Sequence, residues 1–212
     1  MPILISLQTA FVATALALIC GVTLAAWRVH RRSPWLVALD AACLLPLVLP
    51  PTVIGFLLLL TFGRRSPIGS ILEQIGFPLV FSWPGTVLAA FVVSFPIVYL
   101  LSRSAFLTID PALRDASRLL GVSPIQRLLQ IDIPIVRASI ATAAVLAFAR
   151  ALGEFGATLM LAGNIPGRTR TMPIAIYSAV ESGDLNTAVT LSLILVVLST
   201  AVVLVANRFA WK

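Results

Sequence analysis

Charged residues are scarce in this chain, and lysine is almost missing. Only 11% of the 212 residues are charged, and Lys212 is the single lysine. The loop Gly-x-x-x-x-Gly-Lys-Ser/Thr, which holds nucleotide phosphates, therefore does not occur in the sequence. We expect no ATPase site of its own in this chain, so any ATP that drives its function must be hydrolysed by another subunit.

Histidine and cysteine are nearly absent as well. His30 is the only histidine, and the two cysteines, Cys20 and Cys43, both lie inside apolar runs. A single histidine, two cysteines in apolar surroundings and no paired carboxylates at helical spacing offer neither a metal-ligand cluster nor a nucleophile–base pair. We therefore expect free thiols, no metal site, no cofactor and no enzymatic activity in this chain.

What the sequence has in excess is apolar residues, which make up 59% of it. Several runs approach the roughly 20 apolar residues that a helix needs to cross a bilayer. The sequence thus predicts an all-α polytopic membrane protein, one domain over residues 1–212, with lipid around it and about five spanning helices. The expected spans are 3–27, 39–62, 85–101, 139–161 and 188–207.

The first run is preceded by no Lys or Arg and is too long for a signal peptide, so it predicts a retained spanning helix. The second contains Pro46, Pro50 and Pro51, which are expected to break or kink it because proline lacks a backbone donor. In lipid such a break needs neighbouring protein or a water-filled path. A kink that shapes packing and a role in a pathway both remain open.

Basic residues separate the apolar runs, and this pattern predicts orientation. A net charge of +7 could indicate nucleic acid, but these residues do not cluster on one soluble face, so we expect no nucleic-acid partner. An outside N-terminus places ten basic residues inside and four outside, which favours N-out, C-in. The inner ones are Arg28, Arg31, Arg32, Arg103, Arg114, Arg118, Arg127, Arg137, Arg208 and Lys212; the outer ones are Arg64, Arg65, Arg168 and Arg170.

The longest polar stretch covers 102–139 and predicts two short helices at an angle. Asp110 and Pro111 suit the start of the first helix, and Gly121 suits its end. Ser123 and Pro124 repeat the start signal, and Pro134 is expected to end the second helix. We expect the arginines of this loop on its wet side and its leucines and isoleucines against another surface.

This stretch resembles the cytoplasmic signature of bacterial ABC importer permeases, Glu-Ala-Ala, three residues, Gly, nine residues, Ile-x-Leu-Pro. The matching positions are Asp115, Ala116, Ser117, Gly121, Ile131, Ile133 and Pro134. The spacing agrees throughout, with Asp for Glu, Ser for Ala and Ile for Leu as conservative departures. The resemblance implies the membrane domain of a type I ABC importer, whose cytoplasmic coupling helix docks in a groove of an ATPase subunit.

The fourth run contains charges in an apolar context. Arg150 and Glu154 are four residues apart, so on a helix they share a face and can pair. Ionisable residues in a membrane normally face the bundle interior or a polar path, and a translocation gate and a structural ion pair both remain open. Gly153 and Gly156 allow bending or close packing, and Thr158 completes the polar positions of this candidate gate.

Residues 152–158 and 163–173 read Leu-Gly-Glu-Phe-Gly-Ala-Thr and Gly-Asn-Ile-Pro-Gly-x-Thr-x-Thr-x-Pro. They resemble the oxyanion importer permeases, most closely the molybdate branch. The resemblance implies a bacterial or archaeal cytoplasmic-membrane protein. It also implies a homodimer of this chain, two ATPase subunits that bind ATP and Mg, and an extracytoplasmic molybdate-binding protein. Sulfate, thiosulfate or tungstate import is the alternative, and a membrane scaffold without transport is the rival from another class.

Overall fold

The computed structural model describes residues 1–29, 31 and 33–210, with side chains up to residue 205. Its elements are helical throughout this part of the chain. They are α1 (Pro2–Arg28), α2 (Pro34–Val48), α3 (Pro51–Phe62), α4 (Pro67–Gln74), α5 (Trp83–Leu107), α6 (Pro111–Leu119), α7 (Pro124–Arg127), the π-helical turn η1 (Leu128–Asp132), α8 (Ile133–Leu152), α9 (Gly156–Ala162), α10 (Met172–Glu181) and α11 (Leu185–Ala210). Of the positions used above, His30, Arg32, Lys212 and the side chain of Arg208 lie outside this description.

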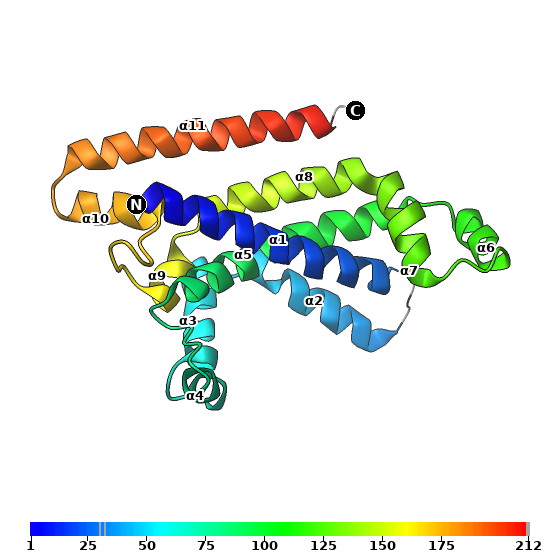
Figure 1. Ribbon diagram of the computed structural model, residues 1–212, viewed down its shortest axis with the longest axis horizontal. Helices are drawn as coiled ribbons and strands as arrows, with labels where there is room; N and C mark the ends of the chain where they lie inside the picture. Colours follow the sequence, from blue (N-terminus) through cyan, green and yellow to red (C-terminus); the bar gives the residue numbers. More distant parts are fainter. Residues whose placement is uncertain (30, 32, 211–212) are drawn as a thin grey trace.

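Helices α1, α5 and α8 form the centre of an elongated bundle, and α11 runs along α8 (Figure 1). Alanine is the main residue at the fully buried positions of the centre, among them Ala13, Ala17, Ala90 and Ala147. Small side chains let helix backbones approach closely, which is how helices associate where lipid removes the hydrophobic driving force. The spans predicted at 3–27, 85–101 and 188–207 are confirmed by α1, α5 and α11, each slightly longer than expected.

The second predicted span is a bent pair of helices. The chain bends by 119° between α2 and α3, and the break falls at Leu49–Pro50, where the backbone is extended. Two successive prolines remove two donors, and each pushes its predecessor out of the helical region. Pro46 lies inside α2 and does not end it, which corrects one of the three expected break points. Within the described residues, four helices can cross a membrane, or five if the bent pair counts as one span.

The fourth predicted span, 139–161, is wrong as one continuous helix. Helix α8 ends at Leu152, and the separate helix α9 begins at Gly156 and packs on α3. The two short helices touch at their backbones: a Cβ atom added to Gly55 would lie 2.7 Å from the Cα of Ala157. Two short helices from distant segments, α3 and α9, therefore pack against each other in place of parts of two expected continuous spans.

The segment 102–139 contains less loop than its polar composition indicates. Its first six residues continue α5, and from Pro124 to Leu152 the chain is helical without interruption. Pro134 therefore does not end a helix, contrary to expectation. The preceding turn η1 is π-helical, with the N–H of Ile133 bonded to the carbonyl of Leu128, and this wider turn accommodates the proline ring.

The two ends of the bundle differ in what they carry. Helices α6 and α7 lie at one end, where α1 and α11 also finish (Figure 1). The N-terminus and α10 lie at the opposite end. The N-terminus and the end of α11 thus lie at opposite ends of the bundle. This arrangement agrees with the N-out, C-in prediction if the α6–α7 end faces the cytoplasm.

Candidate functional site

Helix α6 starts and stops where its sequence predicts. The Asp110 carboxylate accepts a hydrogen bond from the N–H of Ala112 at 2.9 Å, and Pro111 occupies the first turn. Gly121 follows the helix with a φ of +71°, a left-handed conformation that glycine adopts without strain. Ser123 and Gln126 then form a reciprocal capping box at the start of α7. These caps fix a sharp turn between the two helices.

The turn projects large apolar side chains away from the bundle. Leu119 is 89% exposed and Leu120 is 81% exposed, and Ile125 and Leu129 nearby are exposed as well. A monomeric soluble surface rarely shows so many large apolar residues together, and such a patch indicates a protein-binding surface. We call the exposed side chains of Leu119, Leu120, Ile125 and Leu129 the apolar tip.

A buried ion pair supports the apolar tip from the side of the bundle. Arg127 donates from Nε to the Asp132 carboxylate at 3.1 Å, across the turn η1, and both side chains are largely shielded from solvent. Burial and the neighbouring charge of Arg127 lower the pKa of Arg114, which lies beside this pair. Arg127 thus faces inward rather than the wet side, and Arg114 is half-buried, which corrects the expectation for these two arginines.

Some of the signature residues are exposed and others are buried or half-buried. Asp115 and Ala116 are exposed, and Asp115 lies 3.8 Å from Arg118. Ser117 is buried and donates its hydroxyl to the carbonyl of Arg114 at 2.7 Å, a bond within α6 itself. The remaining members are half-buried or exposed along the start of the long helix: Ile131, Ile133 and Pro134.

At the other end of the same long helix, Arg150 and Glu154 pair as the sequence predicts. Arg150 donates from Nη1 to Glu154 Oε2 at 2.7 Å. Glu154 lies in the break after α8, and its second oxygen accepts the N–H of Ala157 at 2.8 Å, which caps α9. The Glu154 side chain is 2% exposed, whereas Arg150 is 32% exposed. The carboxylate is therefore committed to protein contacts, and the guanidinium reaches the surface.

The other candidate gate residues lie in different surroundings. Gly153 is exposed at the end of α8, beside Arg150. Gly156 is buried, and a Cβ there would come within 3.2 Å of Pro51 and Thr52 at the start of α3. Thr158 is buried in α9. In the single chain, Arg150 and Gly153 reach the surface, while Gly156 and Thr158 hold α9 in place.

Sequence reasoning missed a polar cluster between α1, α2 and α5. Asp40 accepts two hydrogen bonds from Arg28, at 3.1 Å and 2.8 Å, and a third from the hydroxyl of Tyr99. Arg103 approaches the same carboxylate at 3.6 Å. The available signal was Asp40 itself, an acidic residue in an apolar run, which normally requires a partner. Its partners lie on other helices and could not be read from spacing.

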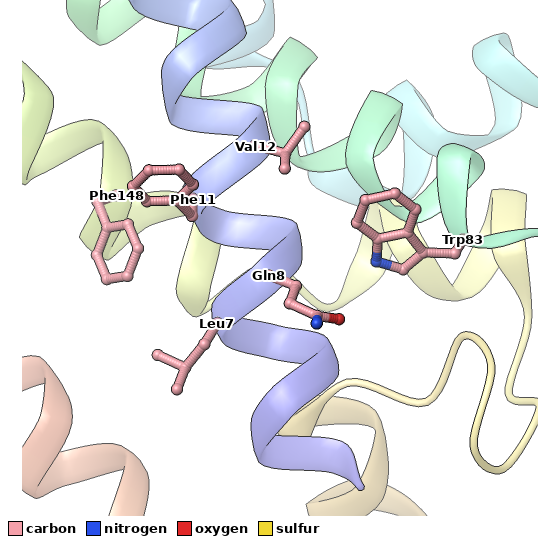
Figure 2. A pocket seen from close by; sticks show the side chains of 6 residues that line it. All are labelled: Leu7, Gln8, Phe11, Val12, Trp83 and Phe148. Carbon is pink, nitrogen blue, oxygen red and sulfur yellow. The ribbon is translucent and has the colours of Figure 1, made fainter.

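A large cavity lies toward the opposite end of the bundle, beside α1 (Figure 2). It measures about 720 Å³, with Phe11 and Phe148 on one side and Gln8 toward Trp83 on the other. The indole N–H of Trp83 is bonded to Thr9 at 3.1 Å. None of the described residues that line it is charged, so they offer no counter-charge for an anion.

Comparison with known proteins places these features in one context. Residues 9–210 match the family described as "Binding-protein-dependent transport system inner membrane component". The chain is 40% identical over 210 residues to the molybdenum transport system permease protein ModB of Escherichia coli K12, covering 98% of this chain and 92% of that protein. It is 44% identical over 184 residues to the putative molybdenum transport system permease YvgM of Bacillus subtilis, covering 86% and 81%.

Solved structures agree on the fold. A bacterial alginate ABC transporter in complex with its periplasmic protein has a chain that matches with a TM-score of 0.76 at 17% identity, over 99% of this chain and 77% of that one. The methionine transporter MetNI in an inward-facing conformation gives 0.76 at 15% identity, over 98% and 92%. The fold is thus that of a type I ABC importer membrane domain. The chain belongs to the family of inner-membrane components of binding-protein-dependent transport systems.

Proposed function

We propose that this chain is the permease subunit of an ATP-driven importer that carries molybdate across the cytoplasmic membrane. The observation that supports it most strongly is the 40% identity to E. coli ModB over 98% of the chain. The relatives described above carry molybdenum names, so sulfate and thiosulfate, the alternatives from the sequence, are less favoured. Tungstate remains the alternative that the transport experiment below addresses directly.

The apolar tip is proposed to dock in a groove of a cytoplasmic ATPase subunit. Exposed leucines and isoleucine on a short helix suit helix-in-groove recognition, in which apolar side chains fill a groove. The signature residues Asp115, Ala116 and Gly121 set the shape of this helix and its stop, and Ser117, Ile131, Ile133 and Pro134 join it to the bundle. In this proposal ATP and Mg bind to the ATPase, and the permease has no hydrolytic site of its own.

The continuous helix from Pro124 to Leu152 is proposed to transmit movement of the ATPase from the apolar tip into the membrane domain. It has 29 residues, which corresponds to roughly 43 Å at 1.5 Å per residue. One end supports the apolar tip and the other ends at the Arg150–Glu154 pair. Movement of an ATPase against the tip would therefore reach the break at Gly153 through one rigid element, a shift between two states biased by nucleotide.

Arg150 is proposed to meet the oxyanion in the path. Its guanidinium is partly exposed within the membrane domain, and a guanidinium binds oxyanions through paired N–H donors. Glu154 offsets part of that charge, so the anion is attracted weakly and can leave. Selectivity between oxyanions is then expected mainly in an extracytoplasmic binding protein. The proposed assembly is a homodimer of this chain with two ATPase subunits and one such binding protein.

The decisive experiment measures ATP-dependent uptake of radiolabelled molybdate into proteoliposomes that hold this chain, its ATPase and its binding protein. Uptake should persist in excess sulfate. Suppression of molybdate uptake by sulfate would move the assignment to sulfate. Suppression by tungstate at equal concentration, with an apparent affinity higher than that of molybdate, would move it to tungstate.

Variants of the apolar tip test the docking role in the same assay. Leu119→Glu with Leu120→Glu should abolish uptake, because charges would have to enter an apolar groove. The matched control, Leu119→Met with Leu120→Met, keeps the tip apolar at the same positions and should transport near the normal rate. Equal uptake by both double variants would reject docking through this surface.

A further inference from the structure

A second cavity lies at the α6–α7 end of the bundle, apart from the apolar tip and from the Arg150–Glu154 pair. It measures about 500 Å³ and opens where α1, α2 and α5 meet. Three arginines line it: Arg28 at the end of α1, Arg31 in the following connection and Arg103 in α5. None of the described residues that line it is acidic. Its charge distinguishes it from the uncharged cavity in Figure 2.

The positive charge of this cavity is only partly neutralised. Asp40 behind it is the carboxylate that contacts the lining arginines, and its oxygens already accept from Arg28 and Tyr99. Arg103 Nη2 lies 3.6 Å from Asp40, beyond hydrogen-bond distance. Among the described residues, the buried Nε of Arg103 has no acceptor. Among the described residues, one carboxylate against three guanidinium groups leaves an excess of about two positive charges, which favours an anionic partner.

The surroundings of the cavity are those of a membrane boundary. Trp27 and Trp35 contact each other with ring centroids 6.2 Å apart, and the Arg31 guanidinium lies 4.6 Å above the Trp27 ring. Both rings are exposed, and tryptophan concentrates where lipid head groups meet the hydrocarbon. Val37 and Leu107, which also line the cavity, are exposed apolar residues. Charge inside and apolar surface at the rim together suit an amphipathic anion.

We propose that this cavity binds the phosphate head group of an anionic phospholipid, with its acyl chains along Val37 and Leu107. Guanidinium groups pair with phosphate oxygens through parallel donors, and basic pockets between spanning helices bind lipid head groups in this way. A soluble oxyanion would use the same donors but would gain nothing from the apolar rim and the tryptophans. The bound lipid would join the ends of α1, α2 and α5 beside the coupling end. This proposal depends on the chain spanning a membrane and not on the anion it transports.

The test is native mass spectrometry of the purified, delipidated chain titrated with phosphatidylglycerol or phosphatidylcholine. Phosphatidylglycerol should bind tightly and phosphatidylcholine weakly. Arg31→Gln and Arg103→Gln should each weaken phosphatidylglycerol binding about fivefold. The control, Arg64→Gln with Arg65→Gln, lies between α3 and α4 and removes one charge more than either test variant, yet it should leave binding unchanged. Arg31 has an exposed side chain, so Arg31→Gln tests the site even if the Arg103 variant folds poorly.

A third arm separates lipid from soluble anion. Inorganic phosphate and molybdate are titrated in place of lipid, with binding followed by the melting temperature of the chain and its Arg31→Gln variant. Only phosphatidylglycerol should raise the melting temperature in a way that requires Arg31. Equal stabilisation by phosphate, equal binding of phosphatidylcholine, or the same loss in the Arg64/Arg65 control would each overturn the proposal.

Discussion

The two ends of the helix from Pro124 to Leu152 reverse the usual relation between side chain and surroundings. Toward the end that extends from the bundle, the chain exposes leucines and isoleucine in the apolar tip. Toward the end inside the apolar bundle, it holds the ion pair of Arg150 and Glu154. Apolar residues in water and charges in a membrane are both unfavourable unless something else contacts them. In the proposed function, an ATPase subunit contacts the apolar end, and the transported oxyanion meets the charged end.

The largest effect is expected at the inner end. Glu154→Ala removes the cap of α9 and leaves Arg150 without its counter-charge, so the free energy of unfolding should fall by roughly 3 kcal/mol. Thermal unfolding in detergent measures this loss. The double variant Arg150→Met with Glu154→Gln leaves no unpaired charge and should recover most of the stability while uptake stays low. If the double variant transports normally, the pair is structural and the contrast between the two ends disappears.

A smaller effect is expected between the ends, at the pair that brackets η1. Arg127→Gln leaves the largely buried Asp132 carboxylate without its charged partner. The cost should be roughly 1–2 kcal/mol, below that of a fully buried pair, because both side chains keep some contact with solvent. The sharper measurement is the number of molybdate ions imported per ATP hydrolysed. That ratio should fall, because a loosened turn transmits less of the ATPase motion. An unchanged ratio would show that the two ends communicate by another route.

The smallest effect is expected at the turn behind the apolar tip. Gly121→Ala places a Cβ on a residue with a φ of +71°, where nothing lies within 4 Å, so the cost is backbone strain alone, about 1 kcal/mol. Gly121→Asn should cost less, because asparagine tolerates this conformation better. Hydrogen exchange of the α6 amides reports the difference. An asparagine variant less protected than the alanine variant would contradict this account.

Local signals in the sequence predicted the outer end of the helix better than the inner one. Asp110, Gly121 and Ser123 act through their immediate neighbours, so their roles as caps and stop follow from residue type and spacing. The pairing of Arg150 with Glu154 was also predicted, because the two residues are only four positions apart in the sequence. The gate role of these residues stays a prediction, and so does the docking role of the signature.

The errors in the fold came from contacts that no local pattern contains. The run 139–161 is largely apolar apart from Arg150 and Glu154, and such a composition alone does not distinguish a full span from a helix followed by a second, short helix. Pro134 reads as a stop, but the π-helical turn before it lets the helix continue. Asp40 pairs with Arg28 and Tyr99 across three helices, and such partners become visible only once the helices are packed.

The backbone contact between Gly55 and Ala157 has a consequence for how the chain is made. Helix α3 needs α9 as its neighbour, but α9 is synthesised about one hundred residues later. At roughly 5–20 residues per second, the ribosome takes about 5 to 20 s to deliver it. During that interval α3 lacks the helix against which its Gly55 face packs. The order of biosynthesis therefore becomes part of the folding problem of this chain.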